Sequence, residues 1–186
     1  MSNAFALLGL PRIAALDAEA LQQAWLAASR SAHPDQPGGD AAHAAEINNA
    51  YETLQAPEKR IKHLLDLHAV PWRTVPIDEA MMSLFGQLGP ALQSVSVFLK
   101  RKQTATSALA KALLAPDEMR LREQLEALGT TLDAERTALL ADLPTFDSRL
   151  SAGDTTALAD LQILQARLAY FGKWQAQVRE ALLSLM

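Results

Sequence analysis

Apolar residues recur at three- and four-residue spacing along most of this chain. Before residue 33 and again after residue 40 they mark one face of a helix: Leu21, Trp25, Ala28 and Ala32, then Ala44, Ile47, Tyr51 and Leu54. This spacing predicts helices over about residues 17–31, 41–55 and 57–68, with a short one near 3–9. Because the alternating β-branched and aromatic pattern of strands is almost absent, the sequence predicts an all-α fold.

The second half of the chain carries longer apolar stripes. We expect three helices here, over roughly residues 77–113, 117–143 and 154–185, and they should pack antiparallel as a three-helix bundle. Gly86 and Gly89-Pro90 should bend or break the first of these helices, because proline removes a backbone donor and clashes with the preceding turn.

Polar and proline residues mark the boundaries of these elements. Asp17 is suited to cap the second helix and Pro57 to begin the fourth, whereas two prolines within residues 71–76 prevent a helix from continuing through that segment. We therefore predict an N-terminal domain over residues 1–70, a stiff linker over 71–76 and a C-terminal helical bundle over 77–186.

Composition narrows the class of protein. The formal net charge is −4 and 49% of the residues are hydrophobic, which permits a real core and argues against a nucleic-acid binder with a basic face. No apolar run approaches the length that spans a bilayer, and the first residues lack the basic start of a secretory signal. We expect a cytoplasmic protein that binds neither nucleic acid nor membrane.

Candidate catalytic chemistry is sparse. The chain has no cysteine, which removes disulfides, a cysteine nucleophile and thiolate metal sites. His33 and His43 flank a loop with two aspartates, and His63 and His68 are five apart on a helix, so neither pair has the four-residue spacing of a common zinc motif. No nucleophile–base pair, phosphate loop or paired-carboxylate cleft is visible. We expect no metal, no cofactor and no enzymatic activity.

Several residues of the first half are interpreted as structural. Trp25 and Tyr51 should belong to the core between the two long helices, and Asn48 and Asn49 should cap or bridge those helices. A small basic cluster should lie on a solvated helix face: Lys59, Arg60 and Lys62.

A His33-Pro34-Asp35 tripeptide lies between the two long N-terminal helices, and a proline- and glycine-rich turn follows it. Taken alone, the triplet would be a polar turn with a capping aspartate. With its flanking helices, and with an apolar opening segment that includes Phe5 and Leu8, it resembles the J domain of DnaJ-type co-chaperones. That resemblance implies a helical hairpin whose loop stimulates the ATPase of a DnaK-type chaperone.

The resemblance also implies roles for the motif residues. Pro34 would fix the loop backbone, His33 would offer a hydrogen-bonding edge, and Asp35 would offer a carboxylate to an arginine of the partner. Arg30 completes the implied chaperone-binding surface. It is the only basic residue of the preceding helix, which is usually basic in this family, and Gln36 stands where the family usually has lysine.

The layout of a J domain, a short linker and a three-helix bundle is similar to the HscB family of co-chaperones. That family delivers the iron–sulfur scaffold IscU to HscA, a specialised DnaK-type chaperone. Three segments carry the resemblance: residues 61–68, 80–84 and 166–173. Because no glycine-rich region or cysteine zinc module follows the J domain, a general DnaJ fits less well.

The HscB resemblance implies a client-binding surface on the first and last bundle helices. Its apolar residues would be neighbours and partly exposed: Met81, Met82, Phe85, Tyr170 and Phe171. Methionine and aromatic residues at this spacing suit a bundle core equally well. The acidic residues that the family uses here are replaced by Ser83, Gly86 and Gln87.

Three hypotheses for function follow. The first is an HscB-like co-chaperone that serves an IscU-type scaffold. The second is a J protein that stimulates the partner ATPase but serves a different client. The third is a degenerate J-like helical protein that acts only as an interaction module, without ATPase stimulation.

Overall fold

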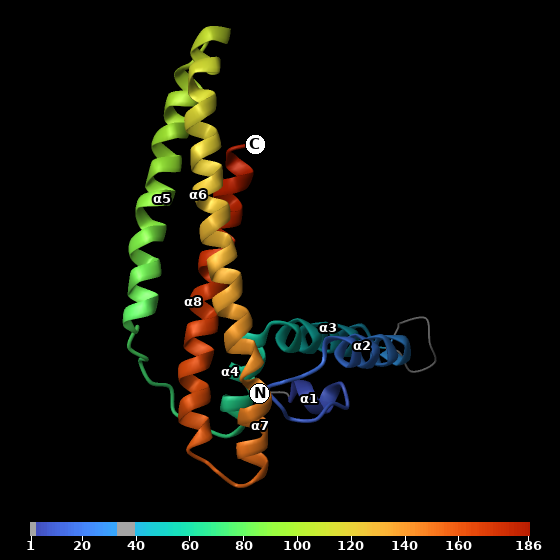
Figure 1. The fold of residues 1–186 in the computed structure, drawn as a ribbon. Coiled ribbons are helices and arrows are strands. Elements are labelled where there is room, and N and C mark those ends of the chain that lie inside the picture. Colours follow the sequence, from blue (N-terminus) through green and yellow to red (C-terminus); the bar gives the residue numbers. More distant parts are fainter. Residues whose placement is uncertain (1–2, 33–39) are drawn as a thin grey trace. The chain divides into compact units, whose positions relative to one another are not determined.

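The computed structural model describes residues 3–32 and 40–186, and every regular element in these two ranges is an α-helix (Figure 1). The all-α prediction is confirmed. By packing, the chain divides into two compact units, one formed by Met1–Val75 with Leu139–Leu168 and the other by Pro76–Ala138 with Ala169–Met186. They are called unit 1 and unit 2 below.

The N-terminal helices of unit 1 begin and end close to where the sequence places them. They are α1 (Ala4–Leu7), α2 (Ala18–Ala32), α3 (Ala41–Gln55) and α4 (Pro57–Leu67). Asp17 caps α2 as predicted, since its carboxylate accepts a hydrogen bond from the Ala20 amide at 2.8 Å. Gly9 follows α1 with a φ of +65°, a left-handed conformation in which glycine avoids the strain of a side chain.

Unit 1 also contains a helix that the sequence analysis missed, α7 (Leu143–Ser151), and the first part of α8 (Ala157–Ser184). Asp147 on α7 accepts hydrogen bonds from the backbone amides of Ala14 and Ala15, each at 2.7 Å. Gln165 on α8 donates to the Glu58 carbonyl at 3.2 Å. Residues 139–168 therefore pack with the N-terminal helices, although the sequence analysis grouped them with the bundle.

The apolar stripes of unit 1 meet in one core. Its fully buried members come from α1, α3, α4 and α8: Phe5, Ile47, Leu54, Ile61, Leu64, Leu161 and Leu168. The spacing that predicted α2 and α3 thus also identifies the side of α3 that is buried.

Unit 2 is built from α5 (Glu79–Thr104), most of α6 (Ala108–Ala141) and the last part of α8. Asp78 caps α5 by accepting a hydrogen bond from the Met81 amide at 2.8 Å. The buried face of each helix follows the three- and four-residue spacing: Met81, Leu88, Val95 and Phe98 on α5; Leu121, Leu125, Leu128 and Leu132 on α6; Phe171, Trp174, Val178 and Leu185 in the last part of the chain.

One predicted helix boundary in this half is wrong, and of the predicted bend or break at Pro90 the break is absent. The break between the first two helices of this half was predicted just before residue 117. It lies at residues 105–107, and Pro116 is inside α6. Ser107 determines this boundary, because its hydroxyl accepts a hydrogen bond from the Ala110 amide at 3.1 Å and so caps α6. Pro90 lies within α5 and does not break it. Pro144 stands in the first turn of α7, where a missing amide proton costs little, so it begins a helix instead of interrupting one.

Candidate functional site

The helical hairpin of α2 and α3 carries the predicted motif between its two helices. α2 ends at Ala32, and α3 begins after Asp40, whose carboxylate accepts a hydrogen bond from the Ala42 amide at 3.0 Å. The motif residues His33, Pro34 and Asp35 lie outside the described residues. Arg30 is exposed in the last turn of α2, next to the motif in sequence.

Trp25 and Tyr51 hold the two helices of this hairpin together. Their rings stack with centroids 4.8 Å apart, and the Trp25 indole Nε1 donates to Asn48 Oδ1 at 2.9 Å. The predicted bridging role of Asn48 is confirmed. Both rings are only partly buried, whereas Ile47 and Leu54 of α3 are fully buried, so Trp25 and Tyr51 do not belong to the buried core in which they were expected.

A buried arginine of α4 contacts the end of α3 at the base of the hairpin. Arg60 donates from Nε to the Ala14 carbonyl at 2.9 Å and from Nη1 to the Leu54 carbonyl at 2.7 Å. Burial lowers the pKa of Arg60, while the nearby carboxylates of Asp147 and Glu58 oppose that shift. The prediction that Arg60 lies on a solvated face is therefore wrong. The guanidinium satisfies backbone carbonyls that would otherwise be buried without donors.

His63 has a structural role as well. Its Nε2 accepts a hydrogen bond from the Ala4 amide at 3.0 Å, and its ring stacks on Phe5 with centroids 5.8 Å apart. Burial is the main cause that lowers the pKa of His63, with the Asp66 carboxylate opposing it. The side chain is thus held neutral, as a hydrogen-bond acceptor for the start of α1.

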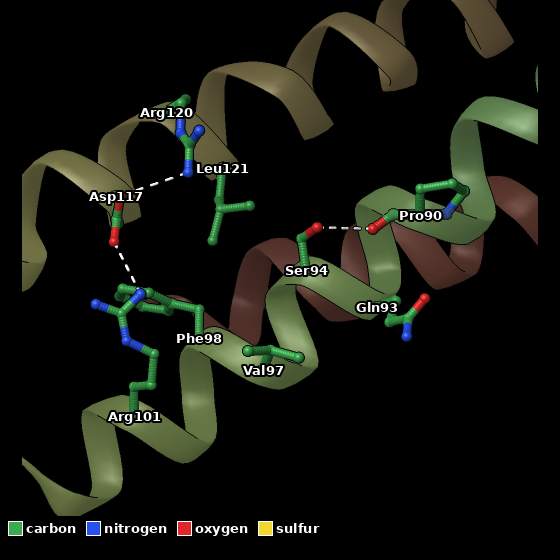
Figure 2. A pocket seen from close by; sticks show the side chains of 9 residues that line it. All are labelled: Pro90, Gln93, Ser94, Val97, Phe98, Arg101, Asp117, Arg120 and Leu121. Carbon is green, nitrogen blue, oxygen red and sulfur yellow. Dashed lines mark hydrogen bonds and ion pairs between the residues drawn. The ribbon is translucent and has the colours of Figure 1, made fainter.

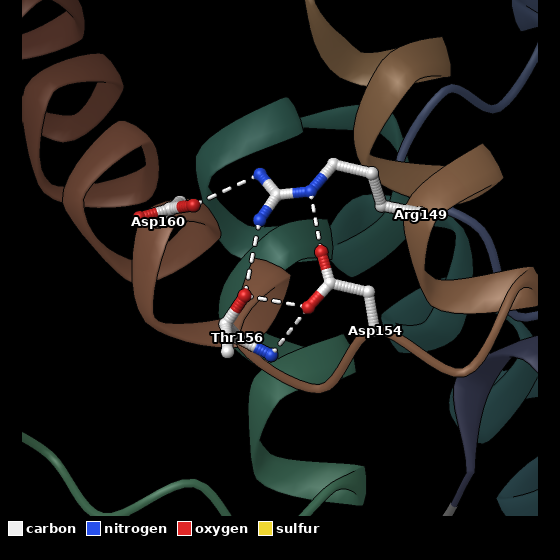
Figure 3. Close-up of polar contacts among 4 residues, drawn as sticks. All are labelled: Arg149, Asp154, Thr156 and Asp160. Carbon is white, nitrogen blue, oxygen red and sulfur yellow. Dashed lines mark hydrogen bonds and ion pairs between the residues drawn. The ribbon is translucent and has the colours of Figure 1, made fainter.

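The turn between α7 and α8 carries a polar cluster that the sequence analysis did not identify (Figure 3). Arg149 contacts the carboxylates of Asp154 at 2.8 Å and Asp160 at 2.9 Å. The pKa of Asp154 is lowered to about 2. The largest cause is the hydrogen bond from the Thr156 side chain, and the next is the hydrogen bond from Arg149. The aspartate and threonine just before the apolar stripe of α8 are the sequence signal for this helix start.

The five predicted client-binding residues separate into two groups within unit 2. Met82 and Phe85 are each 53% exposed and Tyr170 is 39% exposed, whereas Met81 and Phe171 are buried. The expectation of partial exposure is wrong for Met81 and Phe171. Met81 shares the buried stripe of α5 with Leu88, while Met82 is turned about 100° around the helix from it.

Trp174 is the residue of this surface that sequence reasoning missed. It is buried, and its ring lies 6.2 Å from that of Phe85, 5.9 Å from Tyr170 and 5.6 Å from Phe171. Its position three residues after Phe171 and four after Tyr170 was the available signal. Below, the exposed residues Met82, Phe85 and Tyr170, with Trp174 beneath them, are called the aromatic surface.

The α5 side of the aromatic surface is electrically neutral. From Ala80 to Leu99 the sequence contains no Asp, Glu, Lys or Arg. An interface on this part of α5 would therefore depend on apolar burial and hydrogen bonds more than on charge.

A groove of about 360 Å³ lies further along α5, against α6 (Figure 2). Val97 and Phe98 of α5 and Leu121 of α6 give it apolar walls. At one side, Arg101 and Arg120 both contact the Asp117 carboxylate, at 3.0 and 3.4 Å. Because two guanidinium groups share one carboxylate, this side of the groove has a net positive charge next to the apolar walls.

Among residues 3–32 and 40–186, no helix has the length and hydropathy needed to cross a membrane. The same part of the chain contains no cluster of three or more His, Asp or Glu side chains that could hold a metal ion.

Comparisons with known proteins agree on one group of relatives. No protein-family model matches the chain. A co-chaperone protein HscB homolog of Cupriavidus taiwanensis is 33% identical over 141 residues, which cover 70% of this chain and 77% of that protein. A homolog from Chromobacterium violaceum is 40% identical over 74 residues, and this chain spans 42% of its length. The solved structure of the chaperone HscB from Vibrio cholerae superposes over 100% of both chains with a TM-score of 0.63 and 26% identity.

Proposed function

Since this chain belongs to the HscB family of J-type co-chaperones in iron–sulfur cluster assembly, we propose that it stimulates the ATPase of a DnaK/HscA-type chaperone and delivers an IscU-type scaffold to it. In this role the chain carries out no covalent chemistry of its own. It would act in the cytoplasm, on two protein partners.

The α2–α3 hairpin is the observation that carries the chaperone-binding part of this proposal. Its helices are fastened by the Trp25–Tyr51 stack and by the bond from Trp25 to Asn48, and the chain between them contains His33, Pro34 and Asp35. Helices that are already fastened to each other lose little conformational freedom when a partner binds the chain between them. Arg30, exposed beside the loop in sequence, would add a positive charge to the same contact.

Single-turnover ATP hydrolysis by the organism's DnaK-type chaperones tests this part. We expect His33→Gln to abolish the stimulation while leaving the helical content unchanged. His43→Gln is the matched control, because it makes the same change at an exposed histidine of α3, which has a 3.8 Å contact with the Glu46 carboxylate. Equal stimulation by both variants would overturn the ATPase proposal. If the wild-type protein itself gives no stimulation with any of these chaperones, the degenerate interaction module is the correct alternative.

The aromatic surface carries the client-binding part. Met82, Phe85 and Tyr170 offer a contiguous apolar contact, and the buried Trp174 fixes the positions of the two aromatic rings. Met81 and Phe171 would support this surface from the core without touching the client. Hot spots usually combine a few large apolar side chains with a rigid base, and truncating one costs about 2 kcal/mol or more.

Isothermal titration with the IscU-type scaffold tests the client-binding part. We expect Phe85→Ala to weaken binding by about tenfold or more. Val97→Ala, also on α5 and 52% exposed, is the control and should change the affinity little. Because residues 80–99 carry no charge, the affinity should depend only weakly on salt. Unchanged binding by Phe85→Ala, with ATPase stimulation intact, would indicate a J protein that serves a different client.

A further inference from the structure

Helix α6 extends well beyond the end of α8 within unit 2 (Figure 1). The two helices run antiparallel, and Gly129 of α6 faces Val178 of α8, where an added Cβ would lie 3.6 Å from the valine side chain. Six residues further along α8, Ser184 must lie level with about residue 123 of α6, because both helices rise equally per residue. A length of about 21 Å of α6, from its start at Ala108, therefore has no part of α8 beside it.

Over residues 125–132 one side of α6 faces α8. The same side of the helix continues toward Ala108, where α8 no longer covers it. Leu125, Gly129 and Leu132 belong to the covered stretch, and the same three- and four-residue spacing leads back to Glu118, Ala115 and Lys111. Here it lines a groove of about 640 Å³, to which α5 contributes Lys102 and α6 contributes Lys111, Leu114, Glu118, Met119 and Arg122. This hollow is called the hairpin groove below. It lies where a third helix of the bundle would continue.

An apolar side chain stands exposed at the hairpin groove. Met119 is 64% exposed, and Leu114 lines the same hollow next to it. Leu109 and Leu113, which are 72% and 71% exposed, lie about half a turn away on the other side of α6 and do not line the groove. Exposed apolar surface of this kind, edged by polar groups, is typical of a protein interaction site.

The charge of this region is opposite to that of the whole chain. Residues 99–116 contain Lys100, Arg101, Lys102 and Lys111 and no acidic residue, while the complete chain has a net charge of −4. In the groove itself, Lys102 and Arg122 share the single carboxylate of Glu118, at 2.9 and 3.5 Å. Lys111 makes no ion pair with any described residue. The groove is therefore net positive.

We propose that the hairpin groove binds an acidic amphipathic helix of a protein partner. The partner's apolar side would lie on Leu114 and Met119, and its carboxylates would face Lys102, Lys111 and Arg122. The uncovered length of α6 matches about fourteen residues of such a helix, or four turns. A second copy of this chain would bring the same positive charges together, and a concave groove suits a helix better than it suits the flat surface of a membrane. This inference does not depend on the proposed J-type activity.

Fluorescence anisotropy with synthetic peptides tests the proposal on the full chain. The probe is a labelled sixteen-residue helical peptide with leucine at positions i, i+3 and i+4 and glutamate elsewhere, about the length of the groove. Its partner probe replaces every glutamate with lysine. We expect the acidic peptide to bind at least about tenfold more tightly than the basic one, with an affinity that falls as salt rises.

Variants locate the binding site. Lys111→Glu and Met119→Gln should each weaken binding of the acidic peptide by about fivefold or more, since one reverses a charge of the groove and the other removes an apolar contact. Lys59→Glu makes the same change of net charge on an exposed position in unit 1 and should leave the affinity within about twofold. When the acidic peptide binds the wild-type chain, hydrogen exchange should slow in residues 108–122. This measurement locates the contact without relying on the variants.

Three results would overturn the proposal. One is equal binding of the acidic and basic peptides. Another is unchanged affinity in both groove variants. The last is binding of the chain to vesicles of phosphatidylglycerol without binding of the acidic peptide, which would assign the exposed leucines and lysines to a membrane surface.

Discussion

Replacing Arg60 with methionine should destabilise unit 1 by about 3 kcal/mol. The guanidinium is almost fully buried and donates to two backbone carbonyls, those of Ala14 and Leu54. Methionine would fill similar space but leave both carbonyls without a donor. Each unsatisfied buried acceptor costs about 1–3 kcal/mol, and part of the sum is offset because the apolar side chain needs no desolvation.

Urea denaturation followed by circular dichroism measures the total loss of stability, and hydrogen exchange assigns it to a unit. We expect Arg60→Met to unfold at a lower urea concentration and to lose protection in α4 and at the end of α3. The helices of unit 2 should keep their protection, because both carbonyls that Arg60 binds belong to unit 1.

Lys59→Met is the control for this experiment. Lys59 precedes Arg60 in α4 but is exposed, so its replacement should change the free energy of unfolding by no more than about 0.5 kcal/mol. If the two variants unfold at the same urea concentration, the two carbonyl bonds of Arg60 do not stabilise the fold, and the assigned role is wrong.

Two further predictions concern pH. The folded-state pKa of His63 is lowered from 6.5, so the stability that His63 contributes should be complete above pH 6.5 and decline as the pH falls below it. In urea titrations, this decline should be smaller in His63→Gln. It should persist in His68→Gln, the control at an exposed histidine. The pKa of Asp154 is lowered from 3.8 to about 2, so its contribution should be present above 3.8 and be lost as pH falls toward 2; Asp154→Asn should flatten that part of the acid-unfolding curve, and an unchanged curve would contradict the assigned role.

The sequence was sufficient wherever local periodicity determines the structure. Trp25, Ile47 and Leu54 follow a helical repeat, and the helices that carry them begin and end within about two residues of the predicted bounds. Periodicity could not separate Met81 from Met82, because either could lie at the edge of an apolar stripe until the partner helices are placed. The same limit concealed Trp174 as the base of the aromatic surface.

Long-range polar contacts were beyond sequence reasoning. Arg60 lies between two other basic residues of α4 and so suggests a solvated face, yet its partners are carbonyls at Ala14 and Leu54. Asp147 is a carboxylate on a short helix that nothing in the sequence connects with Ala14. Such pairs depend on tertiary packing, which a single sequence does not reveal.

The division of unit 1 between two distant stretches of sequence has a consequence for biosynthesis. Ala14 and Ala15 leave a ribosome long before Asp147, which accepts hydrogen bonds from both of their amides. Until Asp147 emerges, the amides of Ala14 and Ala15 can form hydrogen bonds only with water. When Asp147 binds them, it closes a loop of more than a hundred residues. A nascent chain that stops within the linker would therefore hold an unfinished unit 1, which can be completed only after residues 139–168 have been made.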